Sequence, residues 1–463
     1  MDPQFKSKYR KWGEEQRHFR LGMFKIRLPF IHFRFELPEF AQGIILVAVA
    51  LSATAPIIEG MALVEMFGGN AGLAFQVAVV IVLINTLGVL LHPTAGDPVF
   101  SGWITPAIPL TLAYLSQFGD DPISRLHALR ALQYTVCLIF IILGVTGLAR
   151  KIIAIIPTSI RGGVLLGAAI VAVQGIIIPG GRMAGTEIST IVGLVITFLI
   201  LYSIHFRKAT EKSAVLKAIG KYGMLPGMVV ALIAGMLLGE LPPPTMQWGM
   251  TVLPFGEMFR ALSIFTNGFP PIMYFVSAIP LAITAYIISF GDIVTGEAIV
   301  KEAHNSRPDE KVACNPNLSN VLTGIRNFIQ ATISPFVPIS GPLWTGGTIA
   351  VVERYKTGQK QMDSIFGGAF WYPFGKVVAL LFAPIVALFI PVLPVAMSIT
   401  MIVTGWAAGY IAINMLKTRE EQGVALLVGC AIAFRSPTIG LVVGVICHLL
   451  IGVIKKKGPY GEA

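Results

Sequence analysis

Few side chains in this sequence could carry chemistry inside an apolar environment, and Asp292 is the first of them. It interrupts the apolar stretch 272–299, where an ionisable group is costly unless it faces a cavity or a partner. Ser289 and Thr295 lie three residues before and after it, on the same face of a helix. The three oxygens could coordinate a sodium ion, or Asp292 could exchange a proton. The alternative is a wetted structural residue at the end of a span, which is also how we interpret Glu297.

A second group of candidates surrounds a place where proline interrupts an apolar run. The stretch 332–358 contains Pro335, Pro338 and Pro342 within eight residues. Proline lacks a backbone donor and disfavours helix in the preceding residue, so the sequence predicts an extended piece. A short helix should then begin at Ser340 and Gly341.

Residues 97–106 repeat this order, with Ser101 and Gly102 before a short helix. We call residues 97–106 the first break and residues 332–345 the second break. Interrupted spans at matching places in two halves of a chain indicate a transporter binding site, because the helix starts direct free N–H groups and positive dipole ends at the substrate. Two ordinary proline kinks in a helix bundle are the alternative.

The breaks and the span that contains Asp292 supply the expected ligands. Backbone N–H groups and hydroxyls would bind a polar solute, and Tyr286 or Trp344 could stack on a planar ring, although each aromatic could instead pack in the core or anchor at the interface. Arg326 is expected to snorkel or to pair with an acid. The predicted substrate-binding residues are Phe100, Ser101, Gly102, Tyr286, Ser289, Ser340, Gly341, Trp344 and Thr345, and the predicted ion-coupling residues are Asp292 and Thr295.

Composition sets the class of protein. The 463 residues are 55% hydrophobic and only 13% charged, with a mean hydropathy of +0.75, so the chain is expected to be an all-α, multi-pass membrane protein. Cys137, Cys314, Cys430 and Cys447 show no paired spacing, and neither a disulfide framework, a metal site nor a cofactor is predicted. The net charge of +11 is concentrated at the ends of apolar runs, which argues against a nucleic-acid partner.

The apolar runs predict fourteen spans, several of them shorter than the ~20 residues of a full crossing. With the N-terminus inside, most of the 35 Lys and Arg residues fall on the cytoplasmic side, as the positive-inside rule requires, and both termini are cytoplasmic. The runs are 40–61, 71–91, 100–115, 128–148, 152–177, 186–204, 224–238, 272–299, 318–333, 340–352, 365–389, 392–415, 424–434 and 438–454.

An internal repeat divides these spans into two sets of seven. Ile156–Pro157 and Ile390–Pro391 each open a run, and their separation nearly equals that of the two Ser-Gly pairs. Seven is odd, so the second copy must be inverted relative to the first, as in many secondary transporters. The predicted division is a basic N-terminal segment (1–37), a first repeat (38–240), an extracellular linker (241–270), a second repeat (271–457) and a tail (458–463). Within the N-terminal segment, residues 21–35 should lie on the cytoplasmic leaflet, or else belong to a disordered basic tail.

These landmarks resemble the nucleobase/ascorbate transporter family, the uracil and xanthine permeases, whose fold is shared by sulfate permeases and bicarbonate transporters. In the third span, Pro98, Phe100 and Gly102 are similar to the strand-then-helix segment of that family. Residues 291–301 align without gaps with the eighth span of that family, and residues 338–350 are similar to its tenth span. The resemblance implies a core domain of spans one to four and eight to eleven, and a gate domain of the remaining spans that makes homodimer contacts.

Two departures from the family bear on the substrate. Ile288 and Trp344 stand where the family carries the carboxylates that bind a nucleobase. Without these acids, two positive helix ends also suit a small anion. The sulfate permease branch usually adds a soluble C-terminal domain, and this chain ends shortly after Lys457, which favours the permease-like interpretation.

The sequence therefore predicts a secondary active transporter in the cell (inner) membrane, in which a proton or sodium gradient drives uptake of a nucleobase-like solute. The alternative cargo is sulfate, bicarbonate or a carboxylate. A passive channel is a third interpretation. An enzyme is not expected, because no span pairs a nucleophile with a base or carries metal ligands.

Overall fold

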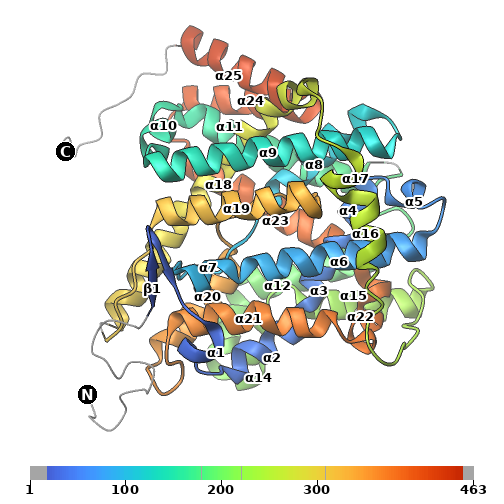
Figure 1. The fold of residues 1–463 in the computed structure, drawn as a ribbon, viewed down its shortest axis with the longest axis vertical. Helices are drawn as coiled ribbons and strands as arrows, with labels where there is room; N and C mark the ends of the chain where they lie inside the picture. The colour runs from blue at the N-terminus through green and yellow to red at the C-terminus, as the bar shows by residue number, and fades with distance from the viewer. Residues whose placement is uncertain (1–17, 179, 221, 308, 452–463) are drawn as a thin grey trace.

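The computed structural model describes residues 18–178, 180–220, 222–307 and 309–451, and these residues are mostly helical. Five of their helices are long and apolar enough to cross a membrane, or eight if each sharply bent pair forms one span. The chain is a multi-pass membrane protein. Through its centre, α9, α19, α6 and α21 run side by side (Figure 1).

The first half of the chain opens with a hairpin and continues through helices interrupted at the first break. Its elements are β1 (Phe19–Leu21), β2 (Phe24–Ile26), α1 (Pro29–His32), α2 (Leu37–Ile45), α3 (Val47–Leu51), α4 (Thr54–Gly60), α5 (Leu63–Met66), α6 (Ala71–Val89), α7 (Leu91–Ala95), β3 (Gly102–Trp103), η3 (Thr105–Ala107), α8 (Ile108–Leu115), η4 (Ser116–Phe118), α9 (Pro122–Thr146), α10 (Ala149–Ile155), α11 (Thr158–Ile177), α12 (Glu187–Tyr202), α13 (Ile204–Lys212), α14 (Ala214–Gly220) and α15 (Leu225–Leu238).

The second half of the chain also places long helices before and after a break. Its elements are α16 (Phe255–Leu262), α17 (Ile264–Asn267), α18 (Ile272–Ser306), α19 (Pro316–Ile333), β4 (Ser340–Gly341), α20 (Thr345–Lys356), α21 (Ile365–Leu380), α22 (Ala383–Phe389), η5 (Ile390–Val392), α23 (Leu393–Met415), α24 (Arg419–Phe434) and α25 (Pro437–Ile451).

One predicted span boundary is wrong. The run 365–389 does not form one helix, because the chain bends at Phe382, whose backbone is extended. Thr251 donates its N–H to the Leu381 carbonyl, and Ala383 donates to Gly249, so the linker between the halves pairs with the chain at this point. The next span is consequently longer than predicted, running from Ala383 to Met415.

Local signals explain where the two breaks begin. Gly96 ends α7 in the left-handed region at a φ of 96°, a conformation that glycine adopts without a Cβ penalty. Ser334 ends α19 with an extended backbone directly before Pro335. After Gly96 and Ser334, the two breaks run through the interior of the protein without helical structure as far as Ile104 and Trp344.

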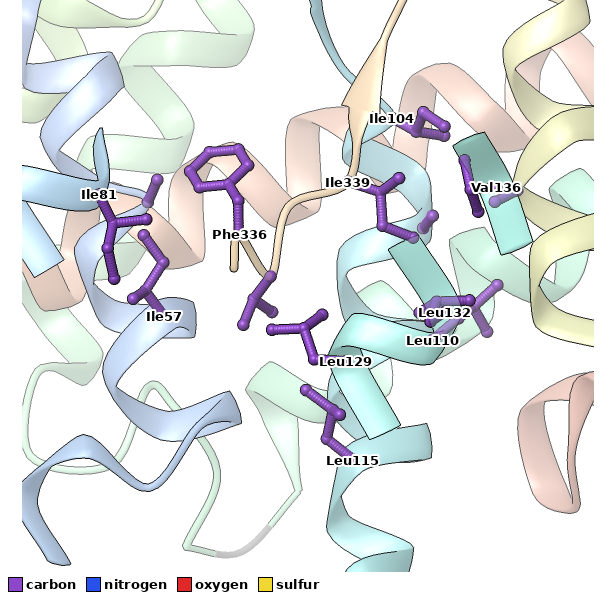
Figure 2. Close-up of a cluster of buried hydrophobic side chains, with 14 of the residues drawn as sticks. Ile57, Ile81, Ile104, Leu110, Leu115, Leu129, Leu132, Val136, Phe336 and Ile339 are labelled. Atoms are coloured by element: carbon purple, nitrogen blue, oxygen red, sulfur yellow. The ribbon is translucent and has the colours of Figure 1, made fainter. Parts of the chain in front are cut away.

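Apolar side chains hold the extended chains in the central core. Ile104 of the first break and Phe336 and Ile339 of the second are fully buried or nearly so, among residues of α4, α6, α8 and α9 (Figure 2). Backbone without helical hydrogen bonds is tolerated at membrane depth only where protein or a cavity covers it. This core supplies such cover.

The described part of the basic N-terminal segment packs against the body of the protein. Arg27 donates its backbone N–H to Thr94, and the Trp371 indole donates to the Arg34 carbonyl. Phe19, Phe30 and neighbouring apolar side chains stay exposed. Residues 1–17 of this segment and the predicted tail 458–463 lie outside the described residues.

Candidate functional site

The two breaks lie against each other as a short antiparallel ladder. Gly102 pairs with Gly341 and Trp103 with Ser340, so the two Ser-Gly pairs meet in the middle of the bundle. Two further bonds extend the ladder: Ile104 N–H donates to the Ile339 carbonyl at 2.9 Å, and Trp344 N–H donates to the Phe100 carbonyl at 2.7 Å.

The ladder corrects the predicted start of the second short helix. Ser340 and Gly341 form the strand β4, and α20 begins at Thr345. These residues form hydrogen-bonded pairs with the first break, and this pairing keeps their backbone extended.

We call the paired residues Gly102, Trp103, Ser340 and Gly341 the crossing, and Arg326 of α19 contacts both breaks there. Its guanidinium donates to the carbonyl of Gly341 at 3.1 Å and to that of Gly102 at 3.3 Å. The prediction that Arg326 snorkels or pairs with an acid is therefore wrong. The side chain is 1% exposed, and arginine's forked geometry suits two ladder carbonyls that lie close together.

Polar side chains surround the Ser340 hydroxyl. Asn85 donates to its oxygen at 3.2 Å, and the hydroxyl donates to Gln330 at 3.0 Å. Trp103 in turn donates its indole N–H to Asn85 at 2.8 Å. Ser101 differs, since its buried hydroxyl has no hydrogen-bond partner among the described residues.

The start of α20 presents unused backbone donors. Within the described residues, the N–H groups of Thr345, Gly346 and Gly347 have no acceptor, whereas that of Thr348 donates to the Trp344 carbonyl. The Thr348 hydroxyl ties this helix start to the first break through both backbone groups of Phe100. Free amides at the positive end of a helix favour a neighbouring negative charge.

Lys376 lies next to this helix start, and sequence reasoning missed it. It is 6% exposed, in the middle of α21, and its Nζ lies 3.9 Å from the ring centroid of Trp344. Phe100 and Tyr372 complete an aromatic surround at 5.4 and 5.5 Å. A lysine inside an apolar run was the available signal, the same one that singled out Asp292.

The predicted residues of α18 are not brought together as a cluster. Tyr286 donates its hydroxyl to Asn320 at 3.1 Å, and the buried Ser289 hydroxyl donates to the Tyr286 carbonyl. Thr295 is exposed, and its hydroxyl donates to Gly291. Among the described residues, half-buried Asp292 has no hydrogen-bond or ion-pair partner.

A cavity of about 390 Å³ lies beside α4, α6 and α23. Arg182, which forms an ion pair with Glu59 at 2.5 Å, contributes to its wall, and Met397 lies at its lining. Met397 belongs to a small apolar cluster with Ile108 and Ile176, against which Trp103 of the first break packs. The cavity therefore borders the apolar side chains that cover the first break.

Three solved structures resemble this arrangement. They are SLC26A9 (13% identity over 90% of this chain and 65% of that chain, TM-score 0.51), the murine Slc26a9 anion transporter in the inward-facing state (14%, 90% and 68%, 0.49) and the transmembrane domain of the cyanobacterial bicarbonate transporter BicA (16%, 88% and 97%, 0.47). No family model matches the chain, and a search of curated proteins finds no relative.

At these identities the likeness shows the fold alone, and of these three comparisons the one with SLC26A9 has a TM-score above 0.5. The chain spans about two thirds of the length of SLC26A9. The chain thus shares the fold of SLC26A9, which is the wider fold that the sequence resemblance implied.

Proposed function

We propose that the protein is a secondary transporter of a small anion such as sulfate, bicarbonate or a carboxylate. The observation that carries this proposal is the start of α20, where three unused backbone amides adjoin the crossing of the two breaks. Fixed N–H dipoles at the start of a helix favour negative charge.

The charges around the crossing support the same class of cargo. Arg326 places a buried guanidinium against the ladder, and Ile288 and Trp344 stand where carboxylates would bind a nucleobase. Glu39, a buried acid on the neighbouring α2, pairs with Arg354. A neutral ring that needs carboxylate acceptors finds none of them here, whereas an anion finds donors. The fold is shared with SLC26A9, and murine Slc26a9 is described as an anion transporter. This likeness adds to the support.

The architecture we propose is the inverted seven-plus-seven repeat with alternating access. Matching contacts support it: α9 packs against α18 and α19, while α21 packs against α2 and α6. Spans one to four and eight to eleven would move the crossing past a gate built from the other spans, with homodimer contacts on the gate. In this proposal both termini are cytoplasmic in the cell membrane, and the cavity beside Arg182 is the outer access path.

Ion coupling, if the transporter uses it, rests on Asp292. The Ser289 and Thr295 hydroxyls bond to backbone carbonyls of their own helix, which leaves the Asp292 carboxylate as the free oxygen ligand of the three. We expect Asp292→Asn to bind the anion within about twofold of the unchanged protein and to lose the dependence of uptake on an imposed proton or sodium gradient. Gradient dependence that survives the substitution would assign coupling elsewhere.

Uptake into proteoliposomes tests the proposal. We expect labelled sulfate, bicarbonate or formate to accumulate, with inhibition by a competing unlabelled anion, and labelled uracil, xanthine, adenine and guanine to stay outside. Accumulation of a nucleobase without any anion would restore the permease-like function. Electrical conductance without saturation or counter-ion dependence would identify a channel.

A further inference from the structure

Lys376 is a buried cation for which the protein supplies no negative partner. Its ammonium has three donors, yet among the described residues it has neither a hydrogen-bond acceptor nor an ion pair. The acids on neighbouring α2 do not serve it, because Glu39 and the adjoining Glu36 pair with Arg354.

Aromatic contacts alone are a weak reason for such a side chain. A cation over aromatic faces gains less free energy than the removal of an ammonium from water costs. A methionine of similar length would fill the same space without that cost. The energetic imbalance indicates that the charge serves something other than the fold.

The surroundings of Lys376 connect it to the crossing. Phe100 comes from the first break and Trp344 from the second, and Trp344 immediately precedes the three unused amides of α20. Their rings lie edge to face at 5.1 Å, so the aromatic surround is built from both breaks at once. The ammonium of Lys376 therefore lies against the residue that directly precedes the start of α20.

We propose that Lys376 is the specificity-determining residue of the anion site: its ammonium provides the charge that a bound anion neutralises, while the amides of Thr345, Gly346 and Gly347 orient the anion. This inference rests on the proposed function and deepens it. It also explains why the charge is retained inside the bundle, since the anion is the partner that the fold lacks.

The test compares Lys376→Met with Lys376→Arg in full-length protein. Lys376→Met keeps the length of the side chain and removes the charge, Lys376→Arg keeps the charge, and Lys417→Met is a matched control at an exposed position. The readouts are uptake of labelled sulfate, bicarbonate and formate, and the rise in Tm that each anion produces in purified protein.

We expect Lys376→Met to reduce uptake and apparent anion affinity at least tenfold, with a Tm in anion-free buffer equal to or above that of the unchanged protein. Lys376→Arg should retain most of the uptake, and Lys417→Met all of it. Uptake by Lys376→Met within twofold of the unchanged protein would overturn the inference while leaving the proposed function intact. Failure of the unchanged protein to transport or bind any anion would overturn both. A Lys376→Met protein that unfolds while Lys376→Arg folds would show that the charge serves the fold, which also contradicts the inference.

Discussion

The two breaks are alike in their strands and different at the helix starts that follow them. In the ladder, glycine faces glycine, and one carbonyl of each break accepts a hydrogen bond from Arg326. After the first break, Pro106 has no N–H, and Ala107 donates its own to Ile104, which leaves little for a ligand. After the second break, Thr345, Gly346 and Gly347 follow one another with unused amides beside a buried lysine.

This difference assigns different tasks to two equivalent segments. The first break is covered by Ile108, Ile176 and Met397 and anchors the crossing in apolar surroundings. The second break carries the free donors and the nearby charge. A site can therefore be asymmetric in its chemistry although its backbone is nearly symmetric, because proline and glycine at the first helical positions decide how many donors are left.

The largest expected effect comes from Arg326→Met, which removes the guanidinium that donates hydrogen bonds to both breaks. Two buried carbonyls, of Gly102 and Gly341, lose their charged donor, and a hydrogen bond to a charged group contributes about 1.5 to 3 kcal/mol. We expect anion uptake to be abolished and the free energy of unfolding to fall, as measured by uptake and by thermal unfolding. Anion uptake near the level of the unchanged protein would show that the hydrogen bonds from Arg326 to the two breaks are dispensable.

A pair of neighbouring glycines sharpens the comparison at the second break. A Cβ at Gly347 would clash with the rings of Trp344 and Phe100, whereas at Gly346 the nearest atom is Trp344 Nε1 at 3.6 Å. Gly347→Ala should displace the aromatic surround, lower anion affinity about tenfold and destabilise the protein by about 1 to 3 kcal/mol. Gly346→Ala, the control, should bind normally and gain up to about 1 kcal/mol from helix propensity. Equal effects of the two substitutions on anion binding would contradict the assignment.

Exchanging the proline pattern of the breaks is expected to have an intermediate effect. Trp344 has φ −110° and ψ 100°, which a following proline accepts, so Thr345→Pro should fold while removing one donor at the first helical position. A hydrogen bond to a charged group contributes about 1.5 to 3 kcal/mol, so we expect about a tenfold loss of anion affinity by thermal shift or calorimetry. Thr345→Ala, which keeps the amide, and Pro106→Ala, at the first break, should both stay within twofold. If Pro106→Ala alters anion binding as much as Thr345→Pro, the two breaks share the ligand.

The smallest expected effect is on the apolar cover of the first break. Met397→Ala shortens a side chain between the cavity and Ile108. We expect anion affinity to be unchanged and passive efflux from loaded liposomes to rise severalfold, because the barrier between cavity and crossing is thinner. Unchanged efflux together with normal uptake would place the access path elsewhere.

Proline and glycine placement made the breaks predictable from the sequence, because few other arrangements satisfy a backbone interrupted at membrane depth. Gly102 and Gly341, which pair in the ladder, belong to the two breaks that the sequence singled out. The start of α20 was misplaced because the pairing that keeps Ser340 extended involves a chain far away in the sequence. Helix boundaries set by tertiary hydrogen bonds leave no local signal.

Charged residues were harder to place. Arg326 donates to two backbone carbonyls that lie close together only once both breaks have formed, so its partners could not be found among the acids of the sequence. Lys376 carries a local signal, a charge within an apolar run, but its aromatic neighbours come from three separate segments. The face of α18 was also only partly predictable, since Ser289 is buried while Thr295 is exposed.

The central claim is that an anion binds at the start of α20 and not at the start of η3. An experimental structure of the unchanged protein with selenate or bromide, in which the anion is located by its anomalous signal, tests this most directly. We predict a peak within hydrogen-bonding distance of the Thr345, Gly346 and Gly347 amides, with Lys376 among the nearest cations. A peak at Thr105 and Ala107, or one at Arg182 alone, would contradict the account.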